Sequence, residues 1–228
     1  MIGAQGFVRW PLGVVFDLDG TLTSNMHFHV QAFDAFAARH GRPPLDAAMR
    51  MRLDGKRNAD IMPIFFDRAF TPEEIAVLAD EKEREYRRLS RGGLSPLPGL
   101  VRFLDLLEER AIPVAIATSA PAENVPHTLG EIGLLERFPR VARSDEQPRG
   151  KPHPDVFLAA AAKIGVDPRE CIAFEDAPTG VLAARAAGMI AVALTTSFDA
   201  SHFAAAAPHL YASDYEHFLA GPFARLLG

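Results

Sequence analysis

The sequence has almost no cysteine, no long hydrophobic run and no excess of positive charge, and each of these shortages excludes a class of protein. Among its 228 residues Cys171 is the single cysteine, so no disulfide framework can form within the chain, and this usage suits a reducing compartment. The formal net charge of -5 offers no electrostatic basis for binding nucleic acid or an anionic membrane surface.

Targeting and membrane-spanning patterns are also missing. Residues 1–10 lack the basic start and apolar core of a signal peptide. The most apolar later stretch, residues 181–194, is too short for a membrane span and is interrupted by Arg185 and Gly188. We therefore expect a cytoplasmic protein, a monomer or weak homodimer, that binds neither nucleic acid nor membranes.

Two aspartates stand directly after the first apolar run of the chain. Residues 12–16 predict a buried strand, and Asp17 and Asp19 follow it at once. Paired carboxylates at the end of a buried strand repel each other and are costly to desolvate, which favours a functional role. The alternative is an ordinary turn, since Asp-Gly is a common turn dipeptide.

The chain alternates between strand-like and helix-like segments after residue 97. Strands are expected at 112–118, 171–174 and 190–194, with a short strand at 210–211. This alternation predicts a doubly wound parallel sheet of the α/β class. Residues 25–96 instead carry helical patterns and end in a Gly- and Pro-rich stretch. We predict an α/β core from residues 1–24 and 97–228, with an inserted all-helical cap at 25–96.

Polar side chains also follow the later strands, and in a parallel sheet they converge on one edge. They are Thr118 and Ser119, Lys151 before a helix, and Glu175 with Asp176. Carboxylates suit Mg²⁺, and a hydroxyl with a lysine suits a phosphoryl group. One carboxylate can attack phosphorus while a second handles the proton of the leaving group, so the set predicts phosphoryl transfer.

Each of these residues also has a plainer interpretation. Thr118 suits the end of a strand because it is β-branched, and Lys151 suits the surface before a Pro-rich turn. The pair Glu175-Asp176 suits the cap of a following helix.

Taken in order, the four sets resemble the four motifs of the haloacid dehalogenase superfamily. The helical insertion resembles the cap of the subfamily that includes β-phosphoglucomutase and many sugar-phosphate phosphatases. The resemblance implies that Asp17 is the nucleophile and a Mg²⁺ ligand. It makes Asp19 the general acid and base and a Mg²⁺ ligand through its carbonyl oxygen. An aspartate at position 19 is typical of phosphatases and phosphomutases in the superfamily.

The resemblance also assigns the remaining motif residues. Thr118 Oγ1 and the Ser119 N–H would hold the transferring phosphate, and Lys151 would neutralise both the phosphate and Asp17. Asp176 would complete the metal site, with Glu175 beside it directly or through water.

Four cap residues are candidates for contacting the substrate by the same resemblance: His29, Lys56, Arg57 and Lys82. For His29 the alternative is a solvated or packing role. Lys82 lies in the charged segment 80–88, where the pairs Asp80/Arg84 and Glu83/Arg87 at i,i+4 predict a solvated helix face.

The resemblance leaves three functions to weigh. The first is a Mg²⁺-dependent phosphatase of a small phosphorylated metabolite, a sugar or polyol phosphate. The second is a β-phosphoglucomutase-like phosphosugar mutase. Residues that the mutase uses to hold a second phosphate correspond to Asn58, Ala120 and Ala122 here, which favours net hydrolysis. The third is a non-catalytic protein that binds a phosphorylated metabolite.

Overall fold

A parallel sheet forms the centre of the molecule, in a computed structural model that describes residues 2–3, 6–7 and 9–224. The strand order is β5-β4-β3-β6-β7-β8, and all neighbouring strands in this sheet are parallel. The strands are β3 (Gly13–Phe16), β4 (Val114–Thr118), β5 (Val141–Arg143), β6 (Cys171–Glu175), β7 (Ile190–Leu194) and β8 (Leu210–Ala212). A separate two-stranded antiparallel sheet pairs β1 (Ile2–Gly3) with β2 (Gly6–Phe7). The α/β class predicted from the sequence is confirmed.

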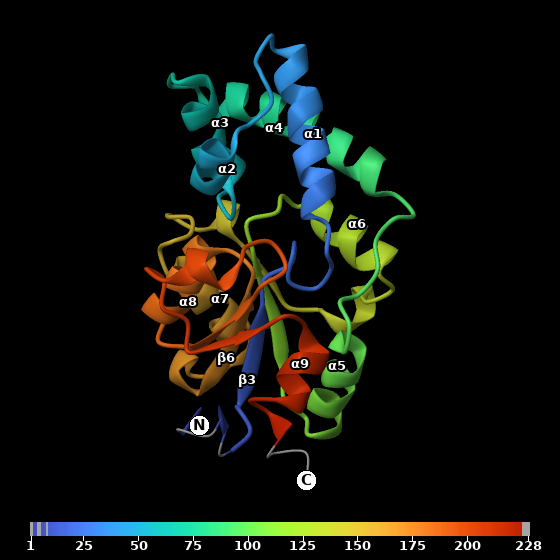
Figure 1. Ribbon diagram of the computed structural model, residues 1–228, viewed down its shortest axis with the longest axis vertical. Coiled ribbons are helices and arrows are strands. Elements are labelled where there is room, and N and C mark those ends of the chain that lie inside the picture. The colour runs from blue at the N-terminus through green and yellow to red at the C-terminus, as the bar shows by residue number, and fades with distance from the viewer. Residues whose placement is uncertain (1, 4–5, 8, 225–228) are drawn as a thin grey trace.

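Helices cover both faces of this sheet, which is why its central strands are continuously apolar. Along β3, Val14 and Phe16 belong to the core on one face, while Val15 belongs to the core on the other. The α-helices of this layer, shown with the sheet in Figure 1, are α5 (Leu100–Glu109), α6 (Asn124–Glu131), α7 (Asp155–Ile164), α8 (Pro178–Ala186) and α9 (Tyr215–Ala220). Short 3-10 helices lie at Leu135–Arg137, Ser144–Glu146, Pro168–Glu170 and Ala200–Phe203.

The helices of residues 25–96, a range that we call the cap segment, lie above the carboxyl ends of the strands (Figure 1). The helices of this segment are α1 (Met26–Arg39), α2 (Ala47–Leu53), α3 (Asn58–Phe66) and α4 (Pro72–Ser90). They enclose an apolar cluster of their own that includes Phe33, Phe36 and Phe65. A separate cluster of this kind is consistent with a distinct cap domain, whose boundaries stay a prediction.

The two ends of the cap segment meet at one place. The N–H of Leu97 donates to the carbonyl of Leu22 over 2.9 Å, and Thr23 forms an isolated antiparallel bridge with Pro96. The chain therefore leaves the sheet layer and returns to it at a single hydrogen-bonded crossing.

Two core elements had no clear signal in the sequence. Strand β5 has three residues and sits at the edge of the sheet, so it lacks the long apolar run that marked the central strands. Helix α6 contains a proline and a glycine, Pro126 and Gly130, which are poor helix formers. Within the described residues, no helix is both long and apolar enough to span a bilayer.

Candidate active site

The predicted motif residues meet at the carboxyl ends of the central strands. Strand β3 pairs with β4 on one side and β6 on the other. Asp17 follows β3 directly, Thr118 is the last residue of β4, and Glu175 is the last residue of β6. A parallel sheet whose connections run to both sides of one strand opens a crevice at this end, and ligands bind there.

Lys151 joins two of these carboxylates from the loop before α7. Its Nζ donates to Asp17 Oδ1 and to Glu175 Oε1, each over 2.6 Å. Lys151 is only 3% exposed, so the alternative of a surface lysine does not hold. Burial alone would lower the pKa of Lys151, but the charges of Asp17 and Glu175 outweigh it and raise the pKa. The ammonium group is therefore held charged beside the predicted nucleophile.

Three buried carboxylates form a pocket suited to a divalent cation. Oxygens of Asp17, Glu175 and Asp176 all lie within 4.8 Å of one another. Burial raises the pKa of Asp17 to about 8; Glu175 and Asp19 add to this, and Lys151 opposes it. Burial, together with the charges of Glu175 and Asp17, also raises the pKa of Asp176. The single positive charge of Lys151 does not balance the negative charge of three carboxylates, so a cation would complete the site. Carboxylate oxygens are hard ligands, which suit an ion such as Mg²⁺.

Two glycines make room for this carboxylate cluster. A methyl group on Gly180, in α8, would overlap the carboxylate of Glu175, and one on Gly20 would overlap that of Asp176. Gly20 also has a φ of +75°, which favours glycine. The Glu175 Oε2 atom accepts from the Ala177 N–H over 2.9 Å, so both of its oxygens are engaged. Sequence reasoning missed both glycines, because their importance lies in contacts across the fold.

Thr118 ends β4 and Ser119 follows it, whereas Asp176 follows β6, so they lie on opposite sides of β3, the strand that leads to Asp17. Thr118 Oγ1 accepts from the Ala120 N–H over 2.9 Å, which leaves its own proton available for a ligand oxygen. Ser119 Oγ donates to the carbonyl of Gly55 in the cap segment over 2.8 Å. The serine side chain thus ties the core to the cap segment, while the N–H role implied for Ser119 stays a prediction.

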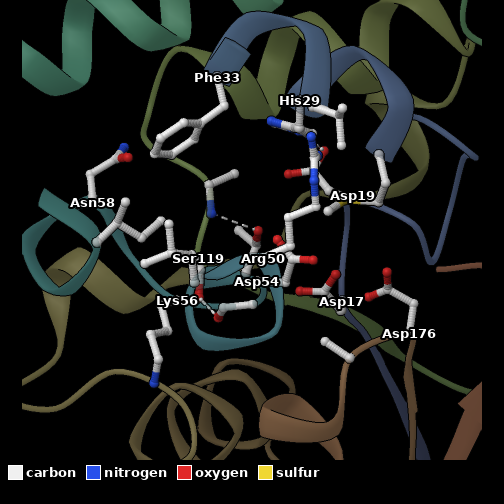
Figure 2. A pocket seen from close by; sticks show the side chains of 18 of the residues that line it. Asp17, Asp19, His29, Phe33, Arg50, Asp54, Lys56, Asn58, Ser119 and Asp176 are labelled. Atoms are coloured by element: carbon white, nitrogen blue, oxygen red, sulfur yellow. Dashed lines mark hydrogen bonds and ion pairs between the residues drawn. The ribbon is translucent and has the colours of Figure 1, made fainter. Parts of the chain in front are cut away.

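The cap residues line the upper wall of the same cavity, as Figure 2 shows. His29 lies above Asp19, with its Nε2 3.5 Å from Asp19 Oδ1, and its ring stacks on Tyr86 with centroids 3.8 Å apart. Besides His29, Asp19 and the other motif residues, the cavity is lined by residues from both parts of the chain: Met26, Val30, Phe33, Leu45, Arg50, Leu53, Asp54, Gly55, Lys56, Asn58, Ile61, Lys82, Glu83, Ala120, Pro121, Asn124, Ala177 and Phe198.

Lys82 and Glu83 are buried in this wall, so the solvated face predicted for their helix does not extend to them. Lys82 Nζ lies 2.6 Å from Glu83 Oε1. Glu83 also accepts from the side-chain amides of Asn58 over 2.9 Å and Asn124 over 2.8 Å. Burial would raise the pKa of Glu83, but the charges of Lys82 and His29 and the hydrogen bonds from Lys82 and Asn58 lower it to about 2.

Of the two charge pairs predicted along this helix, one forms in the structure and one does not. Asp80 and Arg84 do pair, over 2.5 Å. The expected Glu83/Arg87 pair is absent, because Glu83 points into the molecule and Arg87 donates to Asn124 Oδ1 over 2.7 Å instead.

Lys56 and Arg57 are neighbours with different surroundings. Lys56 lines the cavity, although Figure 2 shows its side chain directed away from Asp17 and Asp176. Arg57 is absent from the lining and donates to three core carbonyls, those of Ser144, Gln147 and Pro148, over 3.1, 3.0 and 3.3 Å. The structure thus places Arg57 at a cap–core contact rather than facing the substrate cavity.

The cavity also contains residues that the sequence did not single out. Arg50 and Asp54 lie one helical turn apart at the end of α2 and face the cavity (Figure 2). Burial raises the pKa of Asp54 to about 6, against the charges of Arg50, His29 and Lys82. An i,i+4 spacing next to the Gly55 loop was visible, but such pairs are common on solvated helices.

Comparison with known proteins agrees with this geometry. The family model described as haloacid dehalogenase-like hydrolase matches residues 12–188. The β-phosphoglucomutase of Bacillus subtilis is 34% identical over 78% of this chain and 81% of its own, and hexitol phosphatase A of Escherichia coli is 33% identical over 82% and 84%. A hydrolase crystal structure from Pseudomonas syringae superposes with a TM-score of 0.80 at 28% identity, over 91% of this chain and 96% of that one. This chain therefore belongs to the haloacid dehalogenase-like hydrolases, as its four motifs predicted.

Proposed function

We propose that this hydrolase is a Mg²⁺-dependent phosphatase of a sugar or polyol phosphate that acts through an aspartyl-phosphate on Asp17. The observation that carries the proposal is the buried arrangement of Lys151 with Asp17 and Glu175, beside Asp176 and below Asp19. Relatives named as phosphatases, including a hexitol phosphatase, support the phosphate-ester substrate.

In the first step a carboxylate oxygen of Asp17 attacks phosphorus, and the bond from phosphorus to the leaving oxygen breaks. Lys151 engages Asp17 Oδ1, and the described residues give Oδ2 no hydrogen bond. Oδ2 is therefore the oxygen available for attack. Protonated Asp19 gives its proton to the leaving alkoxide, which departs as an alcohol.

In the second step water attacks the phosphorus of the aspartyl-phosphate while the Asp19 carboxylate takes a proton from it. The bond from phosphorus to Asp17 breaks, so phosphate leaves and both aspartates return to their starting states. Thr118 Oγ1 and Lys151 hold the phosphoryl oxygens through both steps. A Mg²⁺ ion held by Asp17, Asp19, Asp176 and Glu175 would supply the positive charge that offsets that of the phosphoryl group.

The cap wall favours a small leaving group with several hydroxyls. Arg50 and Asp54 place a donor and an acceptor on the cavity, and the amide of Asn58 adds a neutral polar group. Donors and acceptors close together on an enclosed wall can pair with the hydroxyls of a sugar or polyol.

The mutase stays the second candidate because of the 34% identity to a β-phosphoglucomutase. It requires the protein to hold a second phosphate. Asn58 is neutral, and Ala120 offers only a methyl group to the cavity. Ala122 is not among the cavity residues. These three positions favour release of phosphate over its return to a sugar.

The test is a phosphate-release screen over sugar, polyol and nucleotide monophosphates, with Mg²⁺ or with EDTA. We expect release from at least one sugar or polyol phosphate, loss of activity in EDTA and recovery when Mg²⁺ is restored. Isomer conversion that needs a bisphosphate, with little free phosphate, would instead establish the mutase. Inertness over the whole panel would leave only a binding role.

The matched variant for this screen is Asp17→Asn. It removes the nucleophile but keeps the shape of the side chain, so we expect no turnover above background and an unchanged circular dichroism spectrum. Substantial residual activity would contradict the mechanism.

A further inference from the structure

Asn25 lies at the start of α1, where an asparagine usually caps its own helix. The side chain of an N-cap asparagine typically accepts a bond from the backbone two or three residues ahead. Asn25 makes no such bond, although it is completely buried. Its side chain instead turns back toward the catalytic loop. Something other than helix capping therefore sets its position.

Three bonds fix the amide of Asn25. Its Oδ1 accepts from the Gly20 N–H over 2.9 Å, and its Nδ2 donates to Asp19 Oδ1 and to the Tyr86 hydroxyl, each over 2.6 Å. A backbone N–H can only donate, so a flipped amide would set two donors against each other at Gly20. The Nδ2 group must therefore face Asp19.

This orientation decides where the proton of Asp19 resides. When Asp19 is protonated, the bond from Asn25 Nδ2 favours Oδ1 as the carbonyl oxygen of the carboxyl group, because a carbonyl oxygen accepts a hydrogen bond more strongly than a hydroxyl oxygen does. The proton is left on Oδ2, for which the described residues provide no hydrogen-bond partner and which is free to face the cavity.

The third bond links this amide to helix α4, the last helix of the cap segment. Tyr86 lies on α4 and is completely buried, and its hydroxyl also lies 3.1 Å from Thr128 Oγ1 on the core helix α6. The hydroxyl accepts a hydrogen bond from Asn25 and can donate one to Thr128 Oγ1. Movement of α4 away from the core would break this chain of bonds.

We propose that Asn25 is a positioning residue that keeps the transferable proton of Asp19 on Oδ2, and that Tyr86 makes this depend on the placement of the cap. This assignment rests on the role of Asp19 in the proposed function. It goes beyond that role by naming the side chain that selects the reactive oxygen and the contact that reports the position of the cap.

The experiment compares two leaving groups, because only one of them needs a proton. An alkyl phosphate that the wild type hydrolyses must have its alkoxide protonated, whereas p-nitrophenolate leaves unaided. The quantity to measure is kcat/KM, because it covers phosphoryl transfer to Asp17 and omits the later hydrolysis.

The main variant is Asn25→Asp, which keeps the shape and the acceptor for Gly20 but offers Asp19 an acceptor, so the proton moves to Oδ1. We expect kcat/KM for the alkyl phosphate to fall about 100-fold, the lower end of what a positioned general acid contributes, and the value for p-nitrophenyl phosphate to fall less than about 3-fold. Tyr86→Phe keeps the stacking on His29 and removes one partner of Asn25, so we expect a selective loss of about 5-fold.

Tyr211→Phe is the matched control, because Tyr211 is 40% exposed and outside the cavity lining. We expect it to leave both substrates unaffected. An equal loss for both substrates in the Asn25 and Tyr86 variants, or no loss in either, would overturn the assignment while the proposed function stands. A wild type that hydrolyses neither ester would overturn the proposed function and this assignment together.

Discussion

Gly180 shows how much of this site depends on a single missing methyl group. The helix α8 passes so close to Glu175 that any side chain at position 180 would overlap its carboxylate. Glu175 in turn holds Lys151 and receives the Ala177 N–H. A change at Gly180 that moves Glu175 would therefore also move Lys151, which contacts the proposed nucleophile Asp17.

We predict that Gly180→Ala destabilises the protein by about 2 kcal/mol, as is usual for overpacking a buried site, and weakens Mg²⁺ binding. The matched control is Gly130→Ala in α6, where a methyl group meets nothing within 4 Å. Alanine is the better helix former, so this control should gain about 0.5–1 kcal/mol. Urea unfolding with and without Mg²⁺ measures both. Equal effects of the two substitutions would refute the crowding at Glu175.

Asp54 gives a pH-dependent prediction. Burial raises its pKa in the folded protein to about 6 from the usual 3.8. The folded protein therefore favours the protonated form of Asp54. With respect to this group the folded state is most stable below pH 3.8, and that stability is lost as the pH rises through about 6.

We expect Asp54→Asn, which mimics the protonated carboxyl group, to increase the free energy of unfolding by about 2 kcal/mol at pH 8 and to have little effect near pH 3.5. Denaturant titrations across this range test the sign. Asp199→Asn, at an exposed aspartate, is the control and should change stability by less than about 0.5 kcal/mol at any pH. A stabilisation that does not vary with pH would contradict the burial of Asp54.

At the scale of elements, the loop from Gly55 to Arg57 is where the cap segment meets the core. Arg57 donates to three core carbonyls, and Gly55 accepts from Ser119. Lys56, between them, is one of the residues that line the cavity. Adjacent residues of this loop thus have different surroundings, Arg57 at the cap–core contact and Lys56 at the cavity.

We predict that Arg57→Ala raises KM by a similar factor, about 3- to 10-fold, for every substrate, because it weakens the closed arrangement. Lys56→Ala should instead change the order of preference among substrates. Steady-state kinetics on the best three substrates of the screen distinguishes them, with the exposed Arg52→Ala as control. If Arg57→Ala reorders the substrates and Lys56→Ala does not, the two roles are reversed.

The central strands and motif residues were predictable because their signal is local. Strand β3 is an apolar run followed at once by Asp17, and β6 is followed by Asp176 in the same way. The cap wall was not predictable, because the contacts of Glu83 with Asn58 and Asn124 join segments 25 and 41 residues apart. Nothing in the charged sequence around Lys82 distinguishes the buried face of helix α4 from its solvated face.

At the scale of the whole molecule, a bound cation should couple the site to global stability. The cluster of Asp17, Glu175 and Asp176 brings three acidic groups together in the folded state only. A ligand that binds only the folded state stabilises it in proportion to the logarithm of its concentration.

We predict that Mg²⁺ at about 100 times its Kd raises Tm by about 5–10 °C, which corresponds to about 2.7 kcal/mol in a chain of this size. Asp176→Asn should abolish most of the shift, because it removes a ligand. Thermal unfolding followed by circular dichroism, with EDTA as the reference, provides the measurement. A shift of the same size in the variant would place the cation elsewhere.

The single crossing at Leu22 and Leu97 has a consequence for how such enzymes diversify. Because the chain departs from the sheet layer and rejoins it at one hydrogen-bonded pair, the length and sequence of the intervening segment can change without altering the order of the strands. Lineages can therefore exchange or remodel that module, which supplies one wall of the cavity, while the strands that carry the motif residues keep their order.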